Sequence, residues 1–259
     1  MIKRIISAAI LIPLVIWLLF YAKLYVIKAV LIGVANLGFY EWSGFVGVST
    51  KDKIFYFFIL NIISVSFLFF ENCFIECLFF VFAVHLIFSF SSLKEKRLFE
   101  NFYLFGGILY VLLYLFAGKV VEFNKGRELL FVALVVVWAG DSFAMFGGKA
   151  FGKHKLAALI SPNKTIEGAV CGILGGIFFG VVAGIYFDFN LLFLVFVSLI
   201  ASVVAVLGDL SESVVKRFFN VKDSSHLIPG HGGILDRLDS FSFVVFFVYL
   251  VLRCRELLF

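Results

Sequence analysis

Long apolar segments separated by shorter polar connections make up most of this chain. Each segment is an almost uncharged run of about 18–20 residues, long enough to cross a hydrocarbon core as an α-helix. A short connection between such helices places the chain alternately on the two sides of the membrane. The pattern therefore predicts nine membrane-spanning helices, over residues 5–21, 24–45, 54–70, 73–92, 101–118, 129–147, 168–187, 190–208 and 241–258.

The first segment follows Lys3 and Arg4 and so resembles a signal peptide. No small-residue cleavage site follows its apolar run before the next segment, and we expect a retained helix. Composition agrees with a membrane protein: hydrophobic residues make up 63% of the 259 positions and charged residues 15%, against roughly 45–50% and 25% in a soluble domain. The predicted fold class is all-α and polytopic. One continuous membrane domain is expected, with amino-terminal spans over 1–128 and spans with catalytic loops over 129–259.

Lys and Arg are distributed unevenly across this layout. Fifteen of the 22 fall on one side of the predicted membrane and the remaining seven on the other. Because positively charged loops stay in the cytoplasm, we expect the amino terminus and two long polar loops, at about 148–167 and 209–240, to lie there, and the carboxyl terminus outside. Topology thus accounts for the formal charge of +5, and nucleic acid is not an expected partner.

A carboxylate, Asp141, lies inside the sixth apolar segment. A carboxylate at membrane depth is costly and normally faces a cavity, a partner or a metal, so we interpret Asp141 as facing a site; a helix-end residue reaching water is the alternative. Gly147, Gly152 and Lys153 match the first part of the phosphate-loop pattern G-x-x-x-x-G-K. However, His154 replaces the Ser or Thr that would hold magnesium, and the preceding run is helical, which argues against a phosphate loop.

The first polar loop carries further candidates. Lys153 and Lys155 fit phosphate contacts and charges facing lipid headgroups equally well. In "SPNKT", which begins at Ser161, we expect the start of a helix with Pro162 in its first turn. Backbone N–H groups there, with Lys164 beside them, would suit a phosphate. A plain capped helix explains the same residues equally well.

The eighth apolar segment runs into polar residues that have helical spacing. If the helix continues into the second loop, four of them share one face: Asp209, Ser213, Lys216 and Asn220. Glu212 and Lys216 would form an ordinary i, i+4 ion pair. Asp209 is harder to explain structurally, because it ends an apolar run and no cation precedes it closely.

The stretch "HGGILDRLD" stands immediately before the last apolar segment. Gly232 and Gly233 let backbone N–H groups approach an anion closely. On a helix, Asp236 and Asp239 are three residues apart and can point at one place. Paired carboxylates beside a phosphate indicate Mg²⁺, which prefers oxygen ligands. A helix cap with Arg237 as counter-ion is the alternative.

The string "SVVKRFFNVKDSSHLIPGHGGILDRLD", from Ser213 to Asp239, resembles the signature of the phosphatidate cytidylyltransferases, also called CDP-diacylglycerol synthases. "WAGDSFAMFGGKAFGKHKL" and "SPNKTIEG" resemble that family as well, so the likeness covers roughly 135–245 in detail. It implies Mg²⁺-dependent transfer of a cytidylyl group from CTP to phosphatidic acid, giving CDP-diacylglycerol and pyrophosphate for phospholipid biosynthesis. It also implies a membrane lipid as partner, a homodimer, a second cation beside the magnesium, and a site on the cytoplasmic face of the inner or plasma membrane.

The resemblance further implies roles for the matching positions. The implied metal ligands are Asp209, Asp236 and Asp239. The implied catalytic residues are Lys216, Arg217, His231, Asp236 and Arg237, although no individual role follows for His231. The implied substrate-binding residues are Asp141, Lys153, Lys155, Ser161, Lys164, Ser213, Lys222, Asp223, Gly232 and Gly233.

Three other functions fit the same composition. A CTP-dependent polyprenol or phytol kinase would move the γ-phosphate of the nucleotide instead of its nucleotidyl group. A transporter would use the intramembrane carboxylates as coupling sites. A scaffolding membrane protein would need neither of the two dense polar loops.

Overall fold

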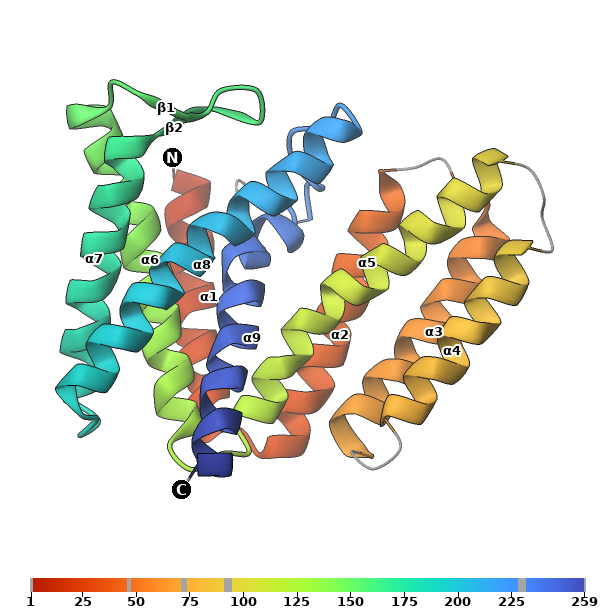
Figure 1. The fold of residues 1–259 in the computed structure, drawn as a ribbon, viewed down its shortest axis with the longest axis horizontal. Helices are drawn as coiled ribbons and strands as arrows, with labels where there is room; N and C mark the ends of the chain where they lie inside the picture. Colours follow the sequence, from red (N-terminus) through yellow and green to blue (C-terminus); the bar gives the residue numbers. More distant parts are fainter. Residues whose placement is uncertain (1, 46–47, 71–73, 91–94, 228–231, 259) are drawn as a thin grey trace.

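The computed structural model describes residues 2–45, 48–70, 74–90, 95–227 and 232–258. Helices dominate the described chain, and a small hairpin is inserted between two of them (Figure 1). The elements in chain order are α1 (Ile2–Tyr21), α2 (Leu24–Gly44), α3 (Thr50–Phe69), α4 (Phe74–Phe90), α5 (Glu95–Val120), α6 (Gly126–Phe151), β1 (Lys155–Ala157), β2 (Ser161–Thr165), α7 (Ile166–Ile185), α8 (Leu191–Phe218) and α9 (Leu235–Leu258).

Each of the nine predicted apolar segments falls on one of these helices. Six helices among the described residues are long and apolar enough to cross a membrane, namely α2, α3, α5, α6, α7 and α8. The described apolar parts of α1 and α4 are shorter, and α9 carries charged residues near both ends. The prediction of a polytopic, mainly α-helical membrane protein is therefore confirmed in outline, whereas nine spans are more than the six that length and composition support.

Two buried clusters of apolar side chains hold the helices together. One lies among α2, α3, α4 and α5, and the other among α1, α6, α8 and α9. Leu31 and Phe116 pack against both clusters, so the two cores are contiguous. Figure 1 shows α5 and α9 side by side between the two groups of helices. The predicted boundary at residues 128 and 129 lies within the first turn of α6.

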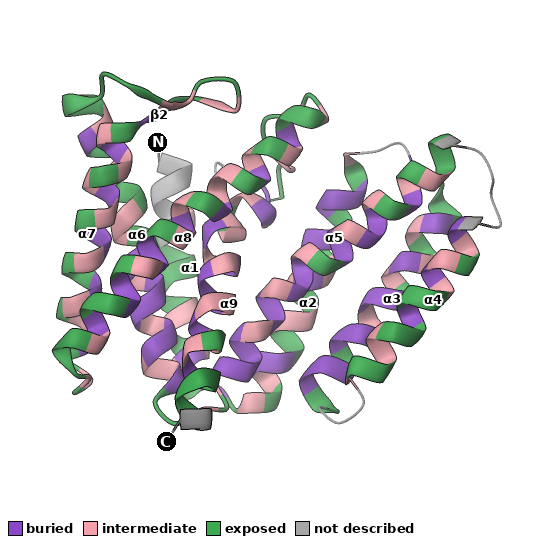
Figure 2. Ribbon diagram, in the orientation of Figure 1, coloured by how far each residue is buried: buried purple, intermediate pink, exposed green. Residues whose placement is uncertain are grey.

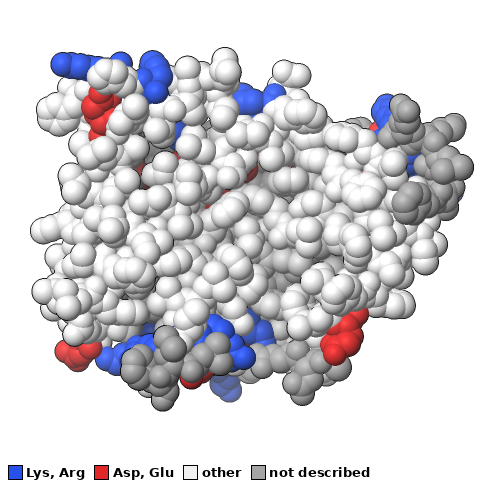
Figure 3. Space-filling view, in the orientation of Figure 1, with Lys and Arg blue, Asp and Glu red and all other residues white. Residues whose placement is uncertain are grey.

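The outer surface has the character expected of a membrane protein. Large apolar side chains such as Phe58 and Phe79 are 72% and 70% exposed, and the outward faces of the helices are largely the exposed ones (Figure 2). In the view of Figure 3, charged side chains gather at two opposite ends of the molecule, separated by a broad uncharged band. Such a band suits the hydrocarbon core of a bilayer.

The segment "SPNKT" is a strand, so the prediction of a helix start with Pro162 in its first turn was wrong. β1 and β2 pair antiparallel, with Lys155 opposite Thr165. Proline lacks an N–H donor, yet the edge strand of a small hairpin tolerates it. Helix α7 begins at Ile166, directly after the last residue of β2. Thr165 caps it, because its hydroxyl accepts a hydrogen bond from the N–H of Gly168. The all-α prediction thus missed one two-stranded hairpin.

The two ends of the hairpin loop are brought together by close packing of α6 against α7. A side chain at Gly172 would meet the backbone oxygen of Gly140 at 2.9 Å, and one at Gly147 would collide with Cys171. Glycine at these two positions therefore allows the helix backbones to approach each other. The hairpin lies across one end of the bundle, beyond the end of α6 and the start of α7 (Figure 1).

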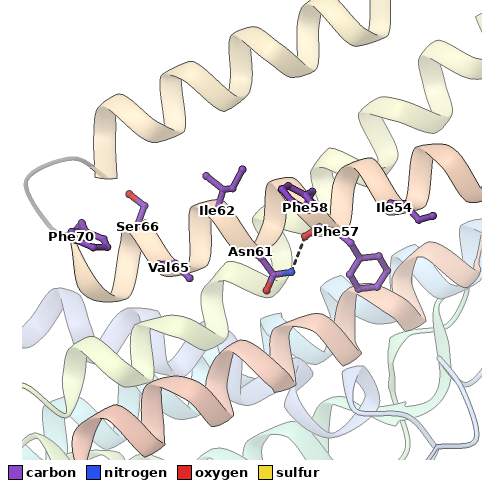
Figure 4. A pocket seen from close by; sticks show the side chains of 8 residues that line it. All are labelled: Ile54, Phe57, Phe58, Asn61, Ile62, Val65, Ser66 and Phe70. Atoms are coloured by element: carbon purple, nitrogen blue, oxygen red, sulfur yellow. Dashed lines mark hydrogen bonds between the residues drawn. The ribbon is translucent and has the colours of Figure 1, made fainter.

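A shallow apolar groove runs along α3, lined by residues from Ile54 to Phe70 (Figure 4). Its polar lining residues are Asn61 and Ser66. Asn61 is engaged in two reciprocal hydrogen bonds with Asn36 of α2, at 2.9 and 3.0 Å. The groove is lined by α3 and the residue after it, away from the polar loops predicted to carry the chemistry.

Candidate active site

Helix α8 extends well beyond its apolar segment and carries the first group of candidate residues. It ends at Phe218, where the N–H of Val221 bonds to the carbonyl of Lys216 and that of Asn220 to the carbonyl of Arg217. This pattern, with Asn220 at a φ of 56°, is a Schellman termination. Asp209, Ser213 and Lys216 therefore lie on one helical face as predicted, whereas Asn220 lies past the helix end and its inclusion was wrong.

Lys216 joins α8 to α9. Its ammonium group lies 3.1 Å from Glu212 and 2.6 Å from Asp236. The i, i+4 pair with Glu212 was expected, and the contact with Asp236 was not. Glu212 is fully buried and Lys216 nearly so, and buried carboxylates need a cation or hydrogen bonds to offset the loss of water. The lysine therefore neutralises part of a buried acidic group while fixing the start of α9.

Asp236 is held by protein groups on both carboxylate oxygens. Oδ1 accepts from Lys216, and Oδ2 accepts from the backbone N–H groups of Ser224 and Gly233, each at 2.9 Å. Lys216 thus forms the ion pair with this carboxylate. The helix-cap alternative had given Arg237 as the counter-ion. Gly232 has a φ of +79°, which glycine adopts without strain. Asp236 orders the turn before α9.

Lys164 of β2 forms an ion pair with Asp209 of α8, and both side chains are partly exposed. The hydroxyl of Ser213 lies 3.5 Å from the same carboxylate. This contact supplies the cation that Asp209 lacks in its own segment. It also brings the two polar loops, which are distant in sequence, to one place.

Three further carboxylates, those of Asp141, Glu212 and Asp239, lie within electrostatic range of Asp209. Asp141 of α6 lies within electrostatic range of Asp209, Lys164 and Arg237. Asp239 of α9 lies within range of Asp209 and Glu212. The close approach of α8 and α9 makes this possible, because a side chain at Gly208 would meet the backbone oxygen of Asp239 at 2.8 Å. Four helix-borne carboxylates thus interact electrostatically through Asp209, and Lys164 pairs with Asp209 itself.

The predicted metal set is only partly compatible with this geometry. Within the described ranges, no three His, Cys, Asp or Glu side chains converge closely enough to hold a metal ion. Asp236 is occupied by hydrogen bonds and Lys216. Asp209 of α8 and Asp239 of α9 remain as carboxylates within electrostatic range of each other, and Asp141 is within range of Asp209. Their oxygen donors fit Mg²⁺ chemistry.

The hairpin is tied to α7 and α8. Glu167 accepts hydrogen bonds from the backbone N–H groups of Lys153 and His154, and its carboxylate lies 2.6 Å from Nδ1 of His154. Arg217 donates from Nε to the carbonyl of Ile160 at 2.9 Å. Arg217 therefore holds the hairpin over the end of α8.

The remaining predicted residues lie at and before the hairpin, in the loop after α8 and at the start of α9. Lys153 is exposed just before β1, and Lys155 is exposed on it. Ser161 is half-buried in β2, and Arg237 is exposed on the first turn of α9. The loop residues Lys222 and Asp223 are exposed as well. His231 lies outside the described residues.

Sequence reasoning missed Glu41 of α2. This residue is 2% exposed and accepts four hydrogen bonds from the loop after α8 and from the start of α9. The available signal was a lone carboxylate within the apolar segment 24–45, with no cation three or four residues away on the same helix face.

These features define a class: a polytopic membrane protein in which lysines, arginines and carboxylates from α6, β2, α8 and α9 meet at one end of a helical bundle. The chain belongs to the Cytidylyltransferase family, whose model matches residues 2–255. It is 48% identical over 124 residues to a phosphatidate cytidylyltransferase of Staphylococcus saprophyticus, covering 47% of this chain and 48% of that protein. Proteins of the same name from Bacillus subtilis, at 47% over 131 residues, and Staphylococcus aureus, at 49% over 128, are similar over 49% and 47% of this chain. The chain is thus matched over about half the length of each relative.

Proposed function

We propose that this protein transfers the cytidylyl group of CTP to phosphatidate, giving CDP-diacylglycerol and pyrophosphate. The observation that carries the proposal is the ion pair between Lys164 and Asp209. Through it, two polar loops contribute their lysines, arginines and carboxylates to one site at an end of the bundle. The relatives named phosphatidate cytidylyltransferase support the same chemistry.

The reaction needs no nucleophilic side chain. An oxygen of the phosphatidate phosphate attacks the α-phosphorus of CTP, and the bond from that phosphorus to the bridging oxygen breaks, so that pyrophosphate leaves with the electron pair. The protein must hold two polyanions together and stabilise the negative charge on the phosphates. Lys153, Lys155 and Lys222 are exposed cations suited to the triphosphate. Arg237 lies within electrostatic range of Asp141, and Arg217 bonds to the hairpin carbonyl of Ile160.

Mg²⁺ is part of the proposal. Asp209 and Asp239, with Asp141 beside them, are the residues that would hold it, because Asp236 is already bound by Lys216 and two backbone N–H groups. A bound Mg²⁺ would neutralise charge on the phosphate oxygens. The Lys164 ammonium group would offset part of the negative charge of this carboxylate group, because it pairs with Asp209.

The surroundings of the site suit a lipid substrate. Acyl chains of phosphatidate would remain against the uncharged band while the headgroup enters the polar end of the bundle (Figure 3). By the distribution of Lys and Arg, this end faces the cytoplasm from the inner or plasma membrane. A homodimer and a second cation are further parts of the proposal, which the resemblance alone supports.

Purified protein in phosphatidate-containing micelles with Mg²⁺ and CTP labelled at the α-phosphate tests the reaction. The proposal expects label in the lipid and unlabelled free pyrophosphate. Label that appears in lipid only from γ-labelled CTP would identify a kinase. Substrate flux across liposomes in the absence of CTP would identify a transporter.

A further inference from the structure

Glu41 is a buried carboxylate at the end of α2 that lies nearest the site, although α2 belongs to the amino-terminal half. Oε1 accepts from the Ser225 hydroxyl at 2.7 Å and from the Ile234 N–H at 2.9 Å. Oε2 accepts from the Ser224 hydroxyl at 2.8 Å and from the Leu235 N–H at 2.9 Å. Four donors therefore surround one carboxylate, all from the second polar loop and the start of α9.

We propose that Glu41 is a positioning residue for the candidate site, which it acts on by fixing the turn that leads into α9. The N–H groups at a helix start lack acceptors within their own helix. Here those of Ile234 and Leu235 are satisfied by a carboxylate from a different helix, whose negative charge also favours the helix amino terminus. The beginning of α9 is thus capped from outside.

The cap is connected directly to the residues of the site. The Ser224 hydroxyl lies between Oε2 of Glu41 and Oδ2 of Asp236, at 2.8 and 2.9 Å. Asp236 in turn accepts from Gly233 and Lys216. A side chain at Gly233 would collide with both Ser224 and the Glu41 carboxylate, so glycine is required for the turn to close on Glu41. Displacing Glu41 would move Asp236 and, one helical turn further, Asp239.

The backbone next to Glu41 is anchored to a second membrane helix, α5. The neighbouring Trp42 donates from Nε1 to the Tyr103 carbonyl at 3.1 Å, and the Tyr103 hydroxyl donates to the Trp42 carbonyl at 3.2 Å. Their rings stack at 5.1 Å between centroids. A functional group held by rigid helices imposes its geometry on a loop more accurately than the reverse. α2 and α5 therefore act as the rigid reference for the turn.

Glu41→Gln tests this role, because it preserves shape but places an amide donor opposite hydrogen-bond donors. The matched control is Asp52→Asn, which alters an equally buried carboxylate, 2% exposed, that bonds to Ser49 and Arg97 outside the network. Hydrogen exchange measured by mass spectrometry should be about tenfold faster in segments 224–227 and 232–235 of the Glu41 variant. The control should leave exchange in those segments unchanged.

Steady-state kinetics provides the second measurement and rests on the proposed function. Misplacing the turn should lower kcat about 10²-fold, while the KM for phosphatidate changes by less than about two-fold. Gly233→Ala should give the same defect, and the double variant should be no worse than the more severe single variant. Asp52→Asn should keep kcat within about two-fold of the unmodified protein.

Unchanged exchange in the two segments, or an equal kcat loss in the Asp52 control, would overturn the positioning role. If the unmodified protein labels no lipid, the proposed reaction fails, and the exchange measurement alone decides whether Glu41 holds the turn. If Glu41→Gln does not fold, Ser225→Ala removes a single donor and keeps the carboxylate. It should accelerate exchange in 232–235 and lower kcat to a smaller extent, and normal values of both would overturn the proposal.

Discussion

Lys164 and Asp209 form an ion pair between the β2 strand and the last turns of α8. The two residues belong to different polar loops: the first loop supplies the lysine and the second supplies the aspartate. The pair is the point at which the hairpin meets the helices that carry the carboxylates. Its position makes Asp209 accessible from the end of the bundle, since both side chains remain partly exposed.

Replacing Asp209 by Asn should remove a carboxylate from the proposed Mg²⁺ site and leave Lys164 without its partner. We expect kcat to fall about 10²- to 10³-fold with little change in thermal stability, because the side chain is partly exposed. The measurement is labelled lipid formed from α-labelled CTP across a Mg²⁺ titration. Removing Mg²⁺ with a chelator should abolish turnover of the unmodified protein, and activity that survives chelation would contradict the metal proposal.

Lys216→Met should lower the stability of the folded protein. The change leaves Glu212 and Asp236 close together in a buried place without their cation, which costs about 3–5 kcal/mol. The melting temperature in detergent should drop clearly. Adding Glu212→Gln to the same protein should recover part of the loss, and a double variant less stable than Lys216→Met would show that the two groups do not interact as proposed.

Gly208→Ala should push α9 away from α8, because the new methyl group would meet the Asp239 backbone oxygen. Overpacking of this kind costs about 1–3 kcal/mol. It should also lower kcat by separating Asp209 from Asp239. Gly33→Ala is the control, since nothing lies within 4 Å of the position of its new methyl group. Equal behaviour of the two variants would argue against close helix contact at Gly208.

Glu167→Gln should loosen the hairpin, because its carboxylate accepts from two backbone N–H groups at the beginning of that loop. Trypsin should then cut after Lys153 and Lys155 several-fold faster, since local opening controls cleavage of folded proteins. Glu128→Gln, a half-buried carboxylate in the first turn of α6, is the comparison. Cleavage at the same rate in both variants would show that Glu167 does not hold the hairpin.

Sequence patterns identified the helices well, because a long apolar run in a membrane pairs its own backbone N–H and C=O groups by forming an α-helix. They also placed Asp209, Ser213 and Lys216 on one face, since helical spacing is a local property. The hairpin was missed because "SPNKT" has polar residues and a proline that suit a helix start as well as an edge strand. Which of the two forms depends on pairing with Lys155–Ala157, and local sequence does not specify that pairing.

Contacts between distant residues account for the other differences. Asp236 looks like a metal ligand from its spacing to Asp239, yet its oxygens are bound by Lys216, Ser224 and Gly233. Glu41 looks like an isolated charge in an apolar segment, because its partners lie at the other end of the chain. In both cases the chemistry of the side chain was clear, and only the fold determined what it binds.

The contact between Glu41 and the start of α9 has a consequence for biosynthesis. A ribosome produces residue 41 long before residues 224–235, so α2 enters the membrane with a carboxylate whose partners do not yet exist. The four donors are present together only once residue 235 has been made. A chain that stops before α9 would leave this buried charge without two of its four donors, which would destabilise the packing of α2 in the unfinished protein.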